Sequence, residues 1–145
     1  MMGMIKSRIA GAAIALGAAA IALPAWAAEP ITGRWVTQDK AAVVAIAPCG
    51  AALCGRIERF LVPPAQGNDQ RDVNNPDPAK RTRKLLGTAI LSGLAADGDG
   101  WRGHVYDPKK GKTYTAKLRR KTDGTLEVKG CLGPFCQAQV WKRAS

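Results

Sequence analysis

The sequence predicts an all-β protein: one antiparallel domain of about eight short strands joined as hairpins. Apolar and polar residues alternate with a period of two, most clearly in residues 112–120. Tight-turn pairs such as Asp97-Gly98 and Asp123-Gly124 separate the segments, and no segment keeps a long helical period. Short strands in hairpin order, each with one apolar face, are typical of a barrel or a two-sheet sandwich, and the near-neighbour connections favour an up-and-down barrel.

The part of the chain before residue 62 predicts a first strand and a hairpin. Residues 33–37 are expected to form a short strand whose Trp35 closes one end of the core. Residues 42–47 are apolar on both faces, and residues 53–60 return with several charged side chains. The turn at residues 48–54 therefore joins two antiparallel strands.

The part after residue 87 predicts five more strands. They are expected at residues 88–94, 101–106, 112–120, 126–129 and 137–142. In the third of these, Tyr114, Ala116 and Leu118 share one face. Many strand positions carry small residues, so the interior of an eight-stranded barrel is expected either to hold a small ligand or to be filled by the aromatic side chains. Both outcomes stay open at this point.

The N-terminus follows the three-part pattern of a secretory signal peptide. Lys6 and Arg8 form the basic end, residues 9–23 are apolar, and Ala25-Trp26-Ala27 fits a cleavage site after Ala27. Pro24 interrupts the apolar run before it reaches the roughly twenty residues that a membrane-spanning helix needs. The pattern therefore indicates export followed by cleavage.

We accordingly expect residues 1–27 to be removed and residues 28–145 to form a single domain, periplasmic or secreted and not membrane-spanning. Lys6 and Arg8 are two of the 22 basic residues, so 20 remain against 11 acidic ones, and the net charge falls from +11 to +9. Export argues against a nucleic-acid partner. Anionic lipids and acidic glycans are the anions that an exported protein meets first, although a solvated basic surface without a specific partner is the commoner explanation.

Four cysteines occur as two pairs with the same spacing. Cys49 and Cys54 bracket one turn, and Cys131 and Cys136 bracket another. Three connectivities are open, and the loop-entropy model favours long-range pairing, at about 4.5 kcal/mol against about 2 kcal/mol for a short closure. Proximity favours two local disulfides, because the turn residues suit hairpins. A zinc site or a redox pair would need a spacing of two residues within each pair.

A polar loop at about residues 62–87 is the longest irregular segment of the domain. Structureless loops of this length are uncommon in small domains and are usually functional, self-packed or disordered. Asp77 directly before Pro78 predicts a helix N-cap, with a single helical turn over residues 78–82. This pattern favours an ordered loop.

The loop also gathers the candidate binding side chains. They are Asp72, Asn74, Asn75, Asp77, Arg81 and Arg83. Arg81 and Arg83 can fold back on the acidic residues of the loop or pair with a carboxylate or phosphate of a ligand. The oxygens of the acidic and amide residues would suit a metal ion. The nearby arginines already supply counter-charge and such asparagines usually form Asx turns, so no metal and no cofactor are expected.

Taken together, several segments resemble the exported bacterial domain-of-unknown-function family 2147. They are Gly33-x-Trp35, the first cysteine pair, the loop motif from Asp72 to Gly87, residues 106–114 and the second cysteine pair. The resemblance covers nearly all of residues 28–145. It implies a lipocalin-like β-barrel in a secreted or periplasmic protein, and it carries over no catalytic residue.

The leading functional hypothesis is a non-catalytic binding protein that holds a small apolar or amphipathic ligand in the barrel, with the loop as its lid. An interaction module for anionic envelope polymers is the alternative. A hydrolase is the third hypothesis, and its candidates are Asp72, Asp77 and His104, the only histidine. No nucleophile and base pair is visible in the sequence, so the binding hypothesis stands first.

Overall fold

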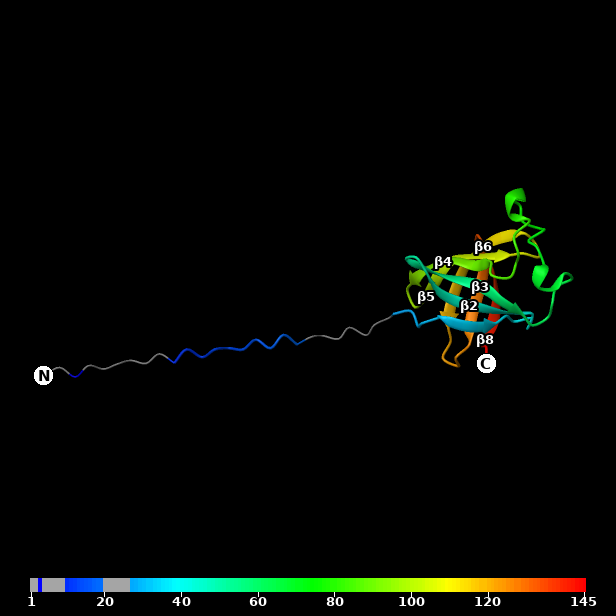
Figure 1. Ribbon diagram of the computed structural model, residues 1–145. Helices are drawn as coiled ribbons and strands as arrows, with labels where there is room; N and C mark the ends of the chain where they lie inside the picture. Colours follow the sequence, from blue (N-terminus) through cyan, green and yellow to red (C-terminus); the bar gives the residue numbers. More distant parts are fainter. Residues whose placement is uncertain (1–2, 4–9, 20–26) are drawn as a thin grey trace.

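A computed structural model describes residues 3, 10–19 and 27–145 of the protein (Figure 1). Eight antiparallel strands follow one another in sequence order and close into a barrel, in which β1 pairs with β8 through Trp35 opposite Arg143. The predicted all-β up-and-down barrel of about eight strands is confirmed. The basic end of the expected signal peptide, Lys6 and Arg8, and its Ala25-Trp26 pair lie outside the described residues.

Most strands are somewhat longer than the alternation pattern indicates, whereas the first is one residue shorter and the sixth has the predicted bounds. Their bounds are β1 (Gly33–Val36), β2 (Ala42–Cys49), β3 (Ala52–Phe60), β4 (Ala89–Asp97), β5 (Gly100–Asp107), β6 (Lys112–Arg120), β7 (Leu126–Leu132) and β8 (Phe135–Arg143). Two 3-10 turns, η1 (Gly67–Asp69) and η2 (Pro78–Lys80), lie in the loop between β3 and β4. The extra strand length lies mainly beside the turns, because ladder pairing continues to Cys49 opposite Ala52 and to Leu132 opposite Phe135.

Both local disulfides expected from the sequence are present. Cys49 is bonded to Cys54 across the β2–β3 turn, and Cys131 to Cys136 across the β7–β8 turn. No cysteine of the chain is left free. In the second hairpin the bonded residues are directly opposed in the strand register, where side chains lie at bridging distance. Each disulfide therefore straps the end of one hairpin.

One end of the barrel is packed solid. Trp35, Leu91, Leu94, Leu118 and Leu126 are fully buried there. The segment before β1 covers this end, because the Trp35 indole donates a hydrogen bond of 2.9 Å to the Ile31 carbonyl and Ile31 is itself buried. The Arg143 guanidinium lies 4.4 Å from the centre of the Trp35 ring, within the range of a cation–π contact. This is the closed end of the barrel.

Two glycines report how tightly the two halves of the interior are filled. At Gly55 a Cβ atom would lie 2.9 Å from Leu91 Cδ1 and 3.1 Å from Val44 Cγ1, closer than side chains pack. At Gly130 an added Cβ would lie 3.5 Å from Val105 and 3.6 Å from Tyr114, at ordinary contact distance. Neither glycine has a positive φ angle, so the comparison reports space alone.

We therefore predict that Gly55→Ala and Gly130→Ala differ sharply in stability. Gly55→Ala should lower the free energy of unfolding by about 1–3 kcal/mol, because it forces a methyl group into a filled core. Gly130→Ala should leave it unchanged or slightly raised, since alanine favours the folded state where its methyl group fits. Urea denaturation of both variants measures the difference. Equal losses would show that both halves of the interior are filled.

Candidate functional site

The opposite end of the barrel is open. In an up-and-down barrel alternate connections share one end, so the β1–β2, β3–β4, β5–β6 and β7–β8 connections all surround this opening. A cavity of about 1180 Å³ lies within it, lined at its rim by residues of all four connections. Six strands each place an apolar or aromatic side chain in the wall below the rim. They are Ile57, Ile90, Val105, Tyr114, Val128 and Trp141.

The aromatic side chains are divided between the two ends, and this division leaves the cavity unfilled. Trp35 is buried at the closed end, where the Trp101 indole also donates a hydrogen bond of 2.9 Å to the Glu29 carbonyl. Tyr114 and Trp141 form part of the cavity wall, and Phe60 lines it as well. The interior is therefore filled in one half of the barrel and open in the other.

The loop between β3 and β4 is built around the carboxylate of Asp72. Asp72 is only 1% exposed, and three side chains donate hydrogen bonds to it. The Tyr106 hydroxyl lies 2.6 Å from Oδ1, and the Asn75 amide and Arg83 Nε lie 2.8 Å and 3.0 Å from Oδ2. A buried carboxylate is tolerated when it is paired and fully hydrogen-bonded, and here both oxygens are satisfied. Asp72 is therefore a structural anchor of the loop.

Asn75, Asp77 and Arg81 complete this network. Asn75 Oδ1 accepts the Asp77 amide at 2.9 Å in an Asx turn, and Asp77 Oδ1 accepts the Ala79 amide at 3.0 Å. Asp77 is thus the predicted N-cap, with Pro78 as the first residue of the turn. The turn is a 3-10 turn that ends at Lys80, shorter than the predicted residues 78–82. Arg81 Nε donates to the Asn75 carbonyl at 2.7 Å.

Asn74 fastens the loop to the β5–β6 turn. Its side-chain amide donates to the carbonyl oxygens of Pro108 and Lys109 at 3.3 Å and 3.1 Å. Gly111 has a φ of +64° and packs so closely on the backbone of Asn74 that a side chain there would overlap its carbonyl group. In Figure 1 the loop, in green, lies beside one end of the barrel with its two helical turns projecting outward.

The structure joins five of the six sequence-predicted binding residues in the Asp72 network, and the sixth, Asn74, is the one among them that lines the cavity. Arg81 and Arg83 bond within the loop and do not face the opening, because the buried carboxylate and a backbone carbonyl engage their guanidinium groups. The basic side chains that do line the cavity are Arg71, Lys109 and Lys110. The sequence signal for the two lysines was the turn after Asp107, which the barrel topology places at the open end.

An ion pair joins two of the connections at the rim. Lys109 Nζ of the β5–β6 turn lies 3.7 Å from Asp39 Oδ2 of the β1–β2 turn. Burial opposes ionisation of Asp39, but hydrogen bonds from Thr37 and the Ala41 amide, with the charge of Lys109, outweigh it and lower the pKa of this carboxyl. Asp39 is therefore the anionic partner of Lys109 at neutral pH.

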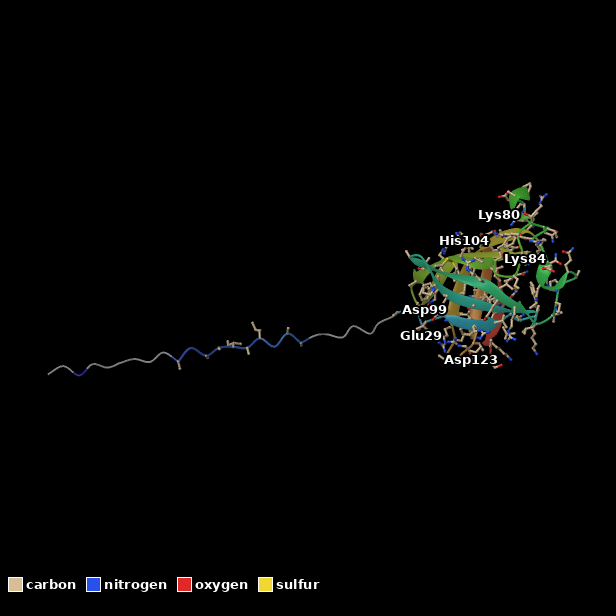
Figure 2. All side chains as sticks on the ribbon, viewed as in Figure 1. Glu29, Lys80, Lys84, Asp99, His104 and Asp123 are labelled. Carbon is tan, nitrogen blue, oxygen red and sulfur yellow. A yellow bond between two sulfur atoms is a disulfide. The ribbon has the colours of Figure 1, made fainter. Side chains whose placement is uncertain are left out.

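The remaining chemical candidates lie apart from one another. His104 is exposed on β5 and faces away from the barrel interior, since its neighbours Gly103 and Val105 face inward. Figure 2 shows His104 together with Lys80 and Lys84 towards one side of the molecule, and Asp99 and Asp123 towards the other. Among the described residues, no three acidic, histidine or cysteine side chains are placed to hold a metal ion.

Comparison with known proteins places this barrel in a family. The model of the family described as "Uncharacterized protein conserved in bacteria (DUF2147)" matches residues 33–143. The chain belongs to this family. The match spans all eight strands of the barrel and the long loop, so the DUF2147 unit and the barrel coincide.

A solved structure shows the same architecture. It is described as protein HP1028 from the human pathogen Helicobacter pylori, which belongs to the lipocalin family. It is similar to this chain with 25% sequence identity and a TM-score of 0.69, over 80% of this chain and 84% of the other. The barrel is therefore lipocalin-like. The search of curated proteins found no match. Within the described residues, no helix has the length and apolar character needed to cross a bilayer.

We predict that Asp72→Asn destabilises the protein by about 1.5–3 kcal/mol, the range for hydrogen bonds to charged groups. The substitution removes the charge that Arg83 pairs with and the acceptor capacity that the three donors share. Asp69→Asn is the matched control, because its carboxylate is 78% exposed and pairs only with Lys84 on the surface. Thermal melts compare them, and equal losses would show that Asp72 is not the anchor.

A second prediction concerns alkaline pH. Burial raises the pKa of Tyr106 to about 12, and the hydrogen bond to Asp72 and its charge act in the same direction. Because the pKa is raised, the stability from this contact is complete below about pH 10, the ordinary tyrosine value, and is lost as the pH rises through the folded pKa. The stability difference between the protein and Tyr106→Phe should therefore shrink above about pH 10.

Tyrosinate absorbance provides an independent readout. The chain has two tyrosines, so Tyr106→Phe identifies the titration of Tyr106 by its disappearance. We expect the variant to lose the transition near pH 12. Persistence of that transition in Tyr106→Phe would contradict the assignment.

Proposed function

We propose that this protein binds one small apolar or amphipathic molecule in the open half of its barrel and carries out no catalysis. The observation that carries the proposal is the cavity of about 1180 Å³ with its apolar wall. Small-molecule sites commonly enclose about 300–1,000 Å³ and are mostly apolar with a few polar groups. Eight-stranded barrels, lipocalins among them, have room for one small ligand. The likeness to a lipocalin-family protein supports the same reading.

The rim favours a ligand with an acidic head. Arg71, Lys109 and Lys110 line the opening against the two carboxylates of Asp39 and Asp107. Lys109 pairs with Asp39, and the Arg71 guanidinium donates to the Thr82 carbonyl at 2.9 Å. The Lys110 ammonium group makes no ion pair within residues 27–145, which leaves it available to an anionic group. An apolar tail would then lie against the wall formed by the strands, as in the sequence-based hypothesis but with different cations.

The loop serves this site as a fixed rim. Val62, Val73 and Leu85 of the loop line the cavity. The Asp72 network and the bonds of Asn74 hold these residues in place, because they tie the loop to β5 and to the β5–β6 turn. Asp72 itself is 1% exposed and does not line the cavity, and His104 is exposed on the outside of β5. These placements support a binding role for the site over a hydrolytic one.

The compartment is part of the proposal. Disulfides form and persist in oxidising compartments, and all four cysteines of this chain are disulfide-bonded. This pattern supports a periplasmic or secreted protein that meets lipids and envelope metabolites. No cofactor is needed for the proposed role.

The test is a fluorescence titration with a fatty-acid probe and with its neutral alcohol analogue. We expect saturable binding in the micromolar range. Gly130→Leu should weaken both probes about tenfold or more, since its side chain projects into the cavity from a position with room for its Cβ. Ala138→Leu, on the exposed side of β8, is the matched control. Lys110→Gln should weaken the acid and not the alcohol.

The outcomes separate the hypotheses. If neither probe binds with saturation, the cavity proposal is wrong. If the acid and the alcohol bind equally and Lys110→Gln has no effect, the cavity proposal stands and the acidic head group is wrong.

A second candidate function follows from the outer face of β5, β6 and β7. Arg102, Lys117 and Lys129 are directly opposed in the strand register, in one row across the three strands. Like charges directly opposite one another destabilise a sheet, and a bound polyanion would relieve that repulsion. Binding of an anionic envelope polymer through this row would depend strongly on salt and would survive Gly130→Leu.

A further inference from the structure

Four exposed apolar side chains surround the opening of the barrel. They are Val62, Val73, Leu132 and Phe135, and all four line the cavity at its rim. Phe135 is 80% exposed, and the other three are 55–60% exposed. Apolar side chains gathered at one place on the surface of a soluble protein, and bordered by polar ones, mark an interaction site.

The barrel topology divides these four residues into two tips on opposite sides of the mouth. Val62 and Val73 belong to the β3–β4 loop, and Leu132 and Phe135 are the last residue of β7 and the first of β8, at the tip of that hairpin. In a closed barrel of eight strands in sequence order, these two connections lie half a circumference apart. The mouth is therefore flanked by an apolar tip on each side.

The β7–β8 tip holds its apolar side chains in fixed positions at the rim of the mouth. Cys131 and Cys136 are directly opposed and disulfide-bonded, and Leu132 pairs with Phe135 beyond them. The disulfide lies next to the Leu132–Phe135 pair. These two side chains therefore cannot move down into the cavity unless the strand pairing at the tip is broken. The exposure of Phe135 is therefore a property of an ordered element.

Cations lie between the two apolar tips. The β5–β6 turn, which follows the loop around the rim, carries the exposed Lys109 and Lys110, and Lys112 begins the next strand. The charge of +9 expected for residues 28–145 has the same sign. Apolar side chains interleaved with lysines fit the boundary of a bilayer with anionic headgroups. The same charges oppose association with a second copy through this face.

We infer that the open end of the barrel docks on the surface of an anionic lipid bilayer. Leu132, Phe135 and Val62 enter the boundary between headgroups and acyl chains, and Lys109 and Lys110 face the anionic headgroups. This inference rests in part on the proposed ligand-binding function, because docking places the cavity directly over the lipid. An amphipathic molecule then passes between bilayer and cavity without exposing its tail to water.

The test measures flotation of the protein with two kinds of vesicle, one of phosphatidylcholine alone and one of phosphatidylcholine with phosphatidylglycerol. The protein is purified in the form that the expressing cells export. We expect binding to the anionic vesicles that falls about tenfold in the double variant Leu132→Ser with Phe135→Ser. Val140→Ser is the matched control, since it removes a partly exposed apolar side chain of β8 away from the mouth. Melting curves establish that each variant is folded.

A charge pair completes the experiment. Lys109→Gln with Lys110→Gln should reduce binding about tenfold at low salt, from the attraction of two lysines to anionic lipid. Lys121→Gln with Lys142→Gln changes the net charge equally at the closed end and should have little effect. If both double variants lost vesicle binding equally, net charge alone would explain the effect and the inference would be overturned.

Two further results would also overturn it: absence of vesicle binding by the unmodified protein, or a dimer in sedimentation that Phe135→Ser abolishes. The failure of docking and the failure of ligand binding are distinguishable. Gly130→Leu should block the fatty-acid probe and leave vesicle binding intact. Vesicle binding without saturable probe binding would support the docking surface and remove the ligand proposal.

Discussion

The Asp72 carboxylate lies out of water where the long loop meets β5, and the arrangement of the open end depends on how it is satisfied. A buried charge must be paired. Asp72 therefore accepts hydrogen bonds from a hydroxyl of β5 and from an amide and a guanidinium of its own loop. Tyr106 lies 34 residues and Arg83 lies 11 residues from Asp72 in the sequence, so this one carboxylate connects distant segments of the chain. The apolar residues that the loop presents to the cavity take their positions from this anchor.

The two halves of the barrel show opposite solutions to the same packing problem. At one end large side chains and the segment before β1 exclude all space, and Gly55 is required because Leu91 and Val44 leave no room for a methyl group. At the other end Gly130 carries no side chain, and the aromatic residues lie in the wall around a cavity instead of filling it. The open half depends on the packed half, because the packed end supplies the rigidity that holds the cavity wall apart.

The strands, the two hairpin disulfides and the Asp77 cap could be predicted because each depends on residues close together in the chain. The placement of Arg83 could not, because its choice between a ligand and Asp72 depends on Tyr106 closing the carboxylate off from water. The position of Lys109 and Lys110 at the cavity rim was missed for a related reason. Local sequence identifies their turn, whereas its position at the rim follows only from strand order around a closed barrel.

The two disulfides each close a short stretch within a single hairpin, and the bonded cysteines are five positions apart in the sequence. Neither crosses the barrel, so the order in which the strands assemble is independent of the order in which the sulfurs are oxidised. A mispaired cysteine would have to join hairpins at opposite ends of the molecule, since the β2–β3 and β7–β8 turns lie at different ends. Each cross-link can therefore form as soon as its own hairpin forms, with little demand for a disulfide isomerase.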